Sequence, residues 1–312
     1  MKKNIKVLQV IPRLGYGGAE TGCYDLAHFL PEQGVKSFVV TSGGELLKYV
    51  NKKKVKIFRL PVHSKNPILI LINIIVLFFI ILFYNINIVH VRSRAPAWSC
   101  YIASKLSFRK IVSTFHGTYN FNNNLKKFYN SIMVRTDLVI AGSNFIFSHI
   151  NENYGEFFLE NKRKLLVIFR GINTNYFNPQ KVLPIKLDKF SKKYNIDRNK
   201  FIILLPGRLT SWKGQKIFIE AIKLLSEKSD IPSFEAIILG NDQGRNVYKK
   251  HLIGLVQQHR LNKMIKFIDH CEEMPVAYGV SNLVCSCSIL PEAFGRVSVE
   301  AQAMQVPIIA SD

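Results

Sequence analysis

Two carboxylates near the end of the chain have the type and spacing to bind hydroxyl groups. Glu292 and Glu300 lie eight positions apart in residues 291–300, and apolar residues at helical spacing follow from about Gly295. This pattern places Glu292 in the loop before a helix and Glu300 about a turn and a half inside it, so both can face one cleft. A helix N-terminus suits a phosphorylated ligand, and carboxylates accept hydrogen bonds from sugar or ribose hydroxyls. A solvated helix with an ordinary acidic first turn explains this stretch equally well.

Two cations stand in a second turn, residues 206–215, between an apolar strand and a helix expected from about Lys213. Arg208 offers a planar fork and Lys213 a point charge, and both beside a helix N-terminus make a good diphosphate site. Gly240 opens another glycine-bearing turn after the next strand, at the same edge of the sheet. The alternative is that both cations are simply solvated.

The first half of the chain carries its own candidate residues. Gly17 and Gly18 belong to a glycine-rich turn into a helix, where the backbone can approach a phosphate or a sugar. His116 ends a predicted strand, in a loop that lines the cleft in this architecture. Arg92 and Arg94 sit in the preceding strand-end loop, where they can meet an anionic acceptor or solvent.

Two common nucleotide-binding motifs are missing. A nicotinamide dinucleotide site needs Gly-x-Gly-x-x-Gly and an acidic residue after the second strand, but position 20 is Glu and that strand ends in Thr41-Ser42. Lys213 is followed by Gly214 and Gln215, so there is no Gly-Lys-Ser/Thr phosphate loop.

Short apolar strands alternate with helical segments along the whole chain. Strands are expected at residues 5–11, 36–41, 56–60, 86–91, 110–115, 138–141, 165–169, 201–205, 235–239, 265–268, 283–286 and 307–310. This rhythm predicts an α/β protein with two doubly wound, mainly parallel sheets, whose ligands bind beyond the carboxyl ends of the strands. A turn-rich segment at 171–179 reads as the hinge, giving domains 1–178 and 179–312.

The amino-acid composition limits the kinds of partner that the protein can have. The 312 residues carry a net charge of +22, which predicts anionic partners such as phosphorylated small molecules, an acidic membrane surface or nucleic acid. No nucleic-acid-binding signature accompanies the charge, so nucleic acid is not expected. Five scattered cysteines indicate a reducing cytoplasm, and Cys285 and Cys287 have the wrong spacing for zinc. The opening residues lead straight into a strand and show no signal peptide.

One segment, residues 68–83, is apolar apart from Asn73. As a helix it would be roughly 24 Å long, shorter than the roughly 30 Å hydrocarbon core of a bilayer. We expect a helix packed against the sheet; a helix whose outer face dips into a bilayer, and a true span, are the alternatives.

Five motifs in this order resemble those of GT-B glycosyltransferases of family 4. They are Gly-Gly-Ala-Glu at 17–20, Phe-His-Gly at 115–117, the stretch 170–179, Gly-Arg-Leu-x-x-x-Lys-Gly at 207–214, and the two glutamates 292 and 300. The resemblance covers essentially the whole chain and implies a retaining transferase that uses a nucleotide-diphosphate sugar. It also implies that the second domain holds the donor and the first the acceptor.

The resemblance further implies roles for individual residues. Arg208 and Lys213 would bind the diphosphate and stabilise it as it leaves, Glu292 would hold sugar hydroxyls, and Glu300 the ribose. His116 would lie near the donor sugar, and Gly17 and Gly18 would line the phosphate and acceptor side. The remaining donor-binding candidates are Gly240, Phe294, Gly295, Arg296 and Val297. No cofactor and no metal are expected, because the chain has no Asp-x-Asp motif of the metal-dependent class.

The family pattern continues beyond Asp312, which predicts an unfinished second sheet, reduced stability and weak or absent activity. The alternative function is therefore an inactive remnant that only binds nucleotide. The basic charge and the apolar segment suggest a glycan or lipid-linked acceptor, as in lipopolysaccharide or other cell-surface polysaccharide synthesis. They also suggest a cytoplasmic protein held peripherally at the anionic inner face of the membrane.

Overall fold

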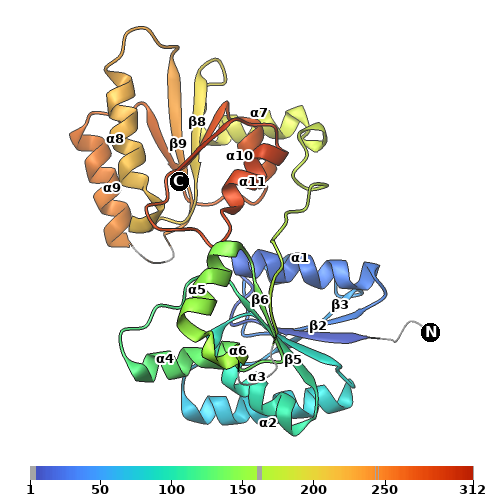
Figure 1. Cartoon of the computed structure of the whole chain (residues 1–312). Helices are drawn as coiled ribbons and strands as arrows, with labels where there is room; N and C mark the ends of the chain where they lie inside the picture. Colours follow the sequence, from blue (N-terminus) through green and yellow to red (C-terminus); the bar gives the residue numbers. More distant parts are fainter. Residues whose placement is uncertain (1–4, 160–163, 243, 245, 312) are drawn as a thin grey trace. The chain divides into compact units, whose positions relative to one another are not determined.

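The chain folds as two compact units, Met1–Arg170 and Gly171–Asp312 (Figure 1). The structure, a computed structural model, describes residues 5–159, 164–242, 244 and 246–311. The division falls eight residues before the boundary expected from the sequence. Ile172 and Phe177 pack into the core of the second unit, so residues 171–178 belong with that unit.

The first unit is built on a seven-stranded parallel sheet with strand order β3-β2-β1-β4-β5-β6-β7. Its strands are β1 (Lys6–Val10), β2 (Lys36–Thr41), β3 (Val55–Arg59), β4 (Ile88–Val91), β5 (Lys110–Phe115), β6 (Leu138–Ala141) and β7 (Lys164–Val167). The order runs outward in both directions from the pair β1 and β4. Right-handed crossovers therefore place the helices that follow these two strands on opposite faces of the sheet.

Helices cover both faces of this sheet. In Figure 1, α1 lies on one face, and α2 and α3 lie on the other. The helices are α1 (Gly18–Glu32), α2 (Pro67–Phe83), α3 (Arg94–Leu106), α4 (Asn124–Ser131), α5 (Asn144–Tyr154) and α6 (Glu156–Leu159), with 3₁₀ turns at Glu45–Tyr49 and Ile132–Val134. Over the described ranges, no helix is both long enough and apolar enough to cross a membrane.

The second unit repeats the design with a five-stranded parallel sheet of order β10-β9-β8-β11-β12. Its strands are β8 (Phe201–Pro206), β9 (Phe234–Leu239), β10 (Ile265–Ile268), β11 (Leu283–Ser286) and β12 (Ile308–Ala310). Its helices are α7 (Pro184–Tyr194), α8 (Gln215–Ser226), α9 (Asn246–Gln258), α10 (Met274–Gly279) and α11 (Arg296–Ala303), with 3₁₀ turns at Pro179–Lys181 and Ser211–Lys213.

Alternate residues of β8 point into two separate cores. Ile202 and Leu204 pack with α7, α10 and α11, whereas Ile203 and Leu205 pack with α8 and α9. A strand buried on both faces needs a continuous apolar run, which explains the sequence Phe-Ile-Ile-Leu-Leu-Pro of β8.

All twelve strands lie at the positions predicted from the sequence. Helix α8 begins at Gln215, two residues later than expected, because Ser211–Lys213 forms a 3₁₀ turn that ends on Gly214 in the left-handed region. Each sheet has one point where the strand order reverses, between β1 and β4 and between β8 and β11. In open α/β sheets, ligands bind in the crevice beyond the carboxyl ends of the strands at such points.

Candidate active site

The candidate site of the second unit lies where its strand order reverses. The loop after β8 carries Arg208 and Lys213, and the loop after β11 carries Glu292. Because β8 and β11 are neighbours in a parallel sheet, these two loops leave it side by side at the same edge. The backbone N–H of Ile289 donates to the carbonyl oxygen of Trp212 at 2.8 Å and joins the loops directly.

Lys213 and Glu292 meet between these two loops. The ammonium group of Lys213 donates to Oε1 of Glu292, and the hydroxyl of Ser288 donates to the same oxygen at 2.5 Å. Both side chains of the ion pair are largely buried, with 16% and 25% of their areas exposed. The Lys213 ammonium also lies 4.4 Å from the centre of the Trp212 ring. The structure therefore places a fixed positive charge and a carboxylate together at the predicted position.

Arg208 stands in the same loop and is exposed to solvent. In the described part of the chain, no hydrogen bond or ion pair reaches its guanidinium group. Its backbone is nonetheless held, because the side-chain amide of the buried Gln215 donates to the carbonyl oxygen of Arg208 at 2.8 Å. Tyr248 of α9 donates in turn to Oε1 of Gln215 at 3.3 Å. The sequence did not single out Gln215, although it is the first residue of α8.

Three glycines allow the loops of this site to pack backbone against backbone. A Cβ atom on Gly240 would lie 1.8 Å from the carbonyl oxygen of Gly207, and one on Gly214 would lie 1.7 Å from that of Cys287. Gly207 also has φ of +155°, a region that side chains disfavour. Gly240, predicted as a donor-binding residue, thus has a packing role that holds the β8 and β9 loops together.

Glu300 is buried in the second unit, and both of its carboxylate oxygens accept hydrogen bonds. Tyr278 donates to Oε2 at 2.8 Å, and Nε of Arg296 donates to Oε1 at 2.9 Å. Burial and the neighbouring Glu300 carboxylate raise the pKa of Tyr278, which keeps its hydroxyl protonated as a donor. The carboxylate predicted to bind ribose is therefore also an anchor of α11.

The remaining predicted residues surround the start of α11. Gly295, with φ of +71°, precedes the first residue of the helix, Arg296. Val297 packs against the core shared with α7 and α10, and Phe294 is half-buried. The predicted loop-to-helix arrangement of residues 291–300 is confirmed, with the helix starting one residue after Gly295.

In the first unit, Gly17 is the N-cap of α1 and Gly18 is its first residue, so both lie where the turn from β1 enters the helix, as predicted. Glu20 folds back over this turn, since a Cβ atom on Gly17 would lie 2.2 Å from its Oε2. The loop after β2 contacts the loop that leads into α1: the N–H of Leu14 donates to the carbonyl oxygen of Gly43 at 2.7 Å. Gly43 and Gly44 both have positive φ. This pair of adjacent glycines was the signal in the sequence from which the contact could have been predicted.

Arg92 lies at the other side of the reversal point in the first sheet. It is 6% exposed, and it donates to Oε1 of Gln9 at 3.1 Å and to the carbonyl oxygen of Ala19 at 3.5 Å. Burial lowers the pKa of its guanidinium group. Its two hydrogen-bond acceptors are neutral and tie β4 to β1 and to the first turn of α1, while the nearby Asp25 and Glu20 carboxylates favour its charged form. Arg92 is thus directed inward, under α1.

His116 follows β5 and has an unusual environment. Both ring nitrogens are shielded from solvent, and neither has a hydrogen-bond partner among the described residues. Buried polar groups are nearly always paired, so an unpaired ring calls for an explanation. Arg94, by contrast, donates to Oδ1 of Asn130 at 2.9 Å and lies 4.4 Å from the centre of the Tyr119 ring.

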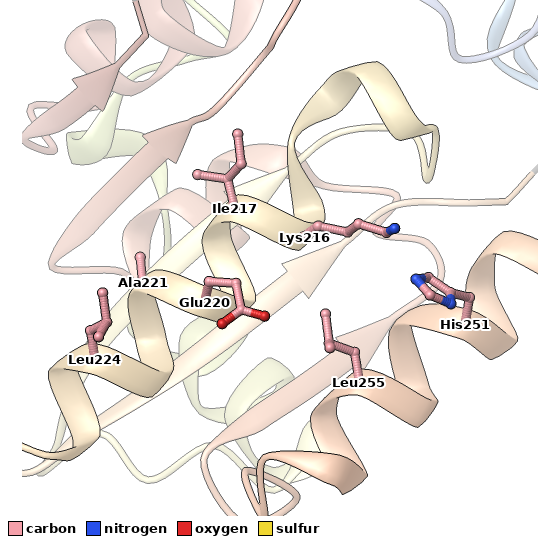
Figure 2. Close-up of a pocket in the computed structure, with 7 residues that line it drawn as sticks. All are labelled: Lys216, Ile217, Glu220, Ala221, Leu224, His251 and Leu255. Atoms are coloured by element: carbon pink, nitrogen blue, oxygen red, sulfur yellow. The ribbon is translucent and has the colours of Figure 1, made fainter.

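Two other features of the described residues lie away from this site or are missing from it. No group of three or more His, Cys, Asp and Glu side chains there could hold a metal ion. An open groove of about 550 Å³ lies between α8 and α9 (Figure 2), lined by Lys216, Ile217, Glu220, Ala221, Leu224, His251 and Leu255. None of the predicted site residues lines it.

Family models match both halves of the chain. The model "Glycosyltransferase Family 4" matches residues 16–176, just over half of the chain, and "Glycosyl transferases group 1" matches residues 187–312. The chain is 29% identical to the putative glycosyltransferase EpsD of Bacillus subtilis over 142 residues, 46% of this chain and 35% of that protein. It is also 29% identical to D-inositol 3-phosphate glycosyltransferase of Corynebacterium glutamicum over 112 residues, 35% of this chain and 27% of that protein. The chain thus spans about a third of the length of these relatives.

Solved structures match nearly the whole chain. A glycosyltransferase from Rickettsia africae is 38% identical, with a TM-score of 0.84, over 99% of this chain and 79% of that one. Anabaena HepE in complex with UDP and glucose shares the fold, with a TM-score of 0.79 at 22% identity over 98% of this chain and 80% of that one. The motifs, the two reversal points and these matches agree, and the chain belongs to glycosyltransferase family 4, with the GT-B arrangement of two parallel sheets.

Proposed function

We propose that this protein is a retaining glycosyltransferase that moves a sugar from a nucleotide-diphosphate sugar to a glycan or lipid-linked acceptor. The observation that carries the proposal is the buried ion pair of Lys213 and Glu292 at the reversal point of the second sheet, beside the exposed Arg208. A largely buried cation is suited to a diphosphate, and a hydrogen-bonded carboxylate is suited to sugar hydroxyls.

The proposed chemistry is electrostatic. When the bond between the sugar and the diphosphate breaks, negative charge builds on the phosphate oxygens and positive character on the sugar ring. Lys213 and Arg208 would stabilise the leaving diphosphate, and preorganised groups of this kind supply much of the rate enhancement in enzymes. The acceptor hydroxyl would attack from the face that the diphosphate leaves.

The carboxylates support a binding role better than a nucleophilic one. Oε1 of Glu292 already accepts hydrogen bonds from Lys213 and Ser288, and both oxygens of Glu300 accept hydrogen bonds as well. A double displacement needs a carboxylate free to attack the sugar carbon. In the first unit, the unpaired ring of His116 supports its proposed place beside the donor sugar.

Structural relatives support the substrate class. HepE from Anabaena is seen with UDP-glucose, and WaaG is described as a glycosyltransferase involved in lipopolysaccharide biosynthesis. We extend these functions to the chain as a proposal: a nucleotide-sugar donor and a role in lipopolysaccharide or other cell-surface polysaccharide synthesis. The five scattered cysteines favour a place in the reducing cytoplasm, and the net charge of +22 favours a peripheral position at the anionic inner face of the membrane.

The direct test is a thermal-shift screen against nucleotide-diphosphate sugars, followed by a transfer assay with the sugars that bind. A ligand at 100 times its dissociation constant adds about 2.7 kcal/mol to the free energy of unfolding. We expect a rise in melting temperature with one class of donor, and an anomeric product of unchanged configuration. Binding without transfer or donor hydrolysis would favour the inactive-remnant alternative, and no binding by any donor would contradict both.

Catalysis is also proposed to be independent of metal, with the Lys213 and Arg208 cations in place of a divalent ion. Turnover should therefore be unchanged after dialysis against EDTA, and added Mg²⁺ or Mn²⁺ should not raise it. A loss of turnover that Mn²⁺ restores would contradict this part of the proposal.

A further inference from the structure

Helix α2 carries an apolar stripe on its solvent side. Exposed side chains recur every three or four residues and are between 44% and 82% exposed: Ile68, Leu71, Ile72, Ile75, Phe79 and Phe83. This spacing puts them on one face of the helix, which we call the outer face. Figure 1 shows α2 at the periphery of the first unit.

The inner face of α2 is the more polar of the two. Asn73 is the one polar residue of the helix, and it is buried, with its amide donating to the carbonyl oxygen of Pro61 at 3.2 Å. Leu77 and Ile81 are fully buried, and Ser99 of α3 donates to the carbonyl oxygen of Ile70 at 3.2 Å. A helix at a water-facing surface normally has its polar residues outside. α2 reverses that arrangement, which is typical of a face covered by lipid or by a partner.

An unusual phenylalanine lies beside the end of this helix. Phe108, just after α3, is 95% exposed and has φ of +54°, a conformation that favours glycine. The next residue, Arg109, donates to Oδ1 of Asn85 at 2.8 Å, so the end of α3 contacts the end of α2. A strained backbone that exposes a whole aromatic ring is a feature expected at a binding surface.

The segment of the chain that contains this face is strongly basic, although Asp137, just beyond it, pairs with Lys105 and Lys110. Residues 46–136 contain 15 Lys and Arg and not a single Asp or Glu. Next to the end of α2, the ammonium of Lys6 donates to the carbonyl oxygen of Tyr84 at 2.8 Å, and that of Lys56 lies 4.3 Å from the centre of the Tyr84 ring. Lys65 is exposed just before the helix. Two copies of such a basic surface would repel each other, whereas an anionic surface would attract it. The charge therefore favours an anionic surface over a second copy of the chain.

We propose that the outer face of α2, together with Phe108, inserts into the surface of an anionic lipid bilayer, while the surrounding cations contact the headgroups. Apolar side chains in the acyl boundary and Lys or Arg at the headgroups are the two elements of this type of attachment. The proposal deepens the proposed membrane-linked function by naming the attachment surface. It does not depend on the donor site.

The test is flotation of the full chain with vesicles of phosphatidylcholine, with and without phosphatidylglycerol. We expect binding to the anionic vesicles that weakens with salt, and a drop of about tenfold or more in partitioning for the double variant Phe79→Ser/Phe83→Ser. The control is Phe29→Ser/Leu125→Ser, which removes apolar side chains of similar exposure, 53% and 82%, from α1 and α4. It should bind as the wild type does.

A second measurement reports insertion itself. In the F79W variant, lipids brominated on the acyl chains should quench the new tryptophan, and the wild-type chain with Trp98 and Trp212 gives the background. Equal binding by the wild type and the α2 double variant would overturn the proposal. The proposal would also be overturned if the chain failed to bind vesicles but formed a dimer that the same double variant abolished. The outer face of α2 would then contact a second copy of the chain. Neither flotation nor tryptophan quenching measures sugar transfer. The membrane proposal and the proposed function can therefore be tested independently of each other.

Discussion

Glu300 combines a predicted binding role with a structural one. The sequence predicts a carboxylate that binds ribose, and the structure shows one already bonded at both oxygens, to Tyr278 and Arg296, inside the core of the second unit. A carboxylate oxygen has a second lone pair, so Glu300 can still accept a hydrogen bond from a hydroxyl group of a ligand. Its orientation is fixed in advance by its neighbours, which is what a binding residue requires.

This anchoring role predicts a cost in stability. Tyr278→Phe removes the hydroxyl that donates to the buried carboxylate, and hydrogen bonds to charged groups contribute about 1.5 to 3 kcal/mol. We expect a loss of that size in the free energy of unfolding, measured by urea denaturation. Tyr101→Phe, which has no described hydrogen bond to lose, is the control. A variant as stable as the wild type would show that the bond is not a stabilising contact.

The charged candidate residues could be found from the sequence, but the residues that support them could not. Arg208, Lys213 and Glu292 stand in strand-end loops with glycines around them, and that local pattern is readable. Ser288 donates to Glu292, Gln215 donates to the carbonyl oxygen of Arg208, and Tyr278 donates to Glu300. Nothing in the local sequence of a buried tyrosine or glutamine marks which side chain it will meet.

At the scale of elements, the site depends on loops that touch through their backbones. The loops after β8 and β9 are joined by hydrogen bonds from Gly207 N–H to the carbonyl oxygen of Leu239 at 2.8 Å and from Leu209 N–H to that of Asn241 at 3.1 Å. Gly240 lies between these two bonds, where there is no room for a side chain. The position of Arg208 therefore depends on a glycine in the neighbouring loop.

The substitution Gly240→Ala should thus be destabilising. The new methyl group would overlap the carbonyl oxygen of Gly207, and overpacking of this kind costs about 1 to 3 kcal/mol. Gly254→Ala is the control: that glycine lies inside α9 with open space around it, and alanine there should stabilise by about 0.5 to 1 kcal/mol. If both variants unfold at the same urea concentration, the close packing of the two loops is not a constraint.

A second prediction concerns the pairing of β4 with β5. Burial, and then the charge of Arg92, lower the pKa of His90 to about 3, and the ring bonds to Thr114 Oγ1 at 2.7 Å. The unfolded chain takes up a proton near pH 6.5 and the folded chain does not, so stability is lost as the pH falls below about 6.5. The contribution of one such group approaches about 1.4 kcal/mol per pH unit.

The check is a comparison of the wild type with His90→Gln. Urea unfolding between pH 6 and 4.5 should show a slope against pH that is smaller in the variant by about one proton. Carboxylates that also titrate in this range are common to both proteins and cancel in the difference. Identical slopes would mean that His90 is protonated in the folded state.

The order of elements was predicted well because parallel strands buried on both faces leave long apolar runs. Two of the elements that the sequence did not predict are short. Helix α10 (Met274–Gly279) and the 3₁₀ turn Ser211–Lys213 contain too few residues to show a periodicity. The unit boundary, at Arg170 and Gly171, depends on which sheet residues 171–178 pack against, and a turn-rich sequence does not encode that choice.

In the molecule as a whole, the two units share the same sheet topology. A parallel sheet reverses its strand order once, and the loops at that point carry the candidate residues: the glycine turn and Arg92 in the first unit, and the cations with Glu292 in the second. The positive charge is distributed unevenly, with residues 46–136 free of acids. The proposed donor chemistry and the proposed surface attachment therefore belong to different units.

The central claim is that Arg208 and Lys213 hold and stabilise the departing diphosphate. The most direct measurement is the turnover of the donor sugar by Arg208→Ala and by Lys213→Ala, with Lys216→Ala on the outside of α8 as the control. Each of the first two should lower turnover by about 10² to 10³, the range seen when one preorganised donor is lost, and the control should be unaffected. Near wild-type turnover in both variants would contradict the account.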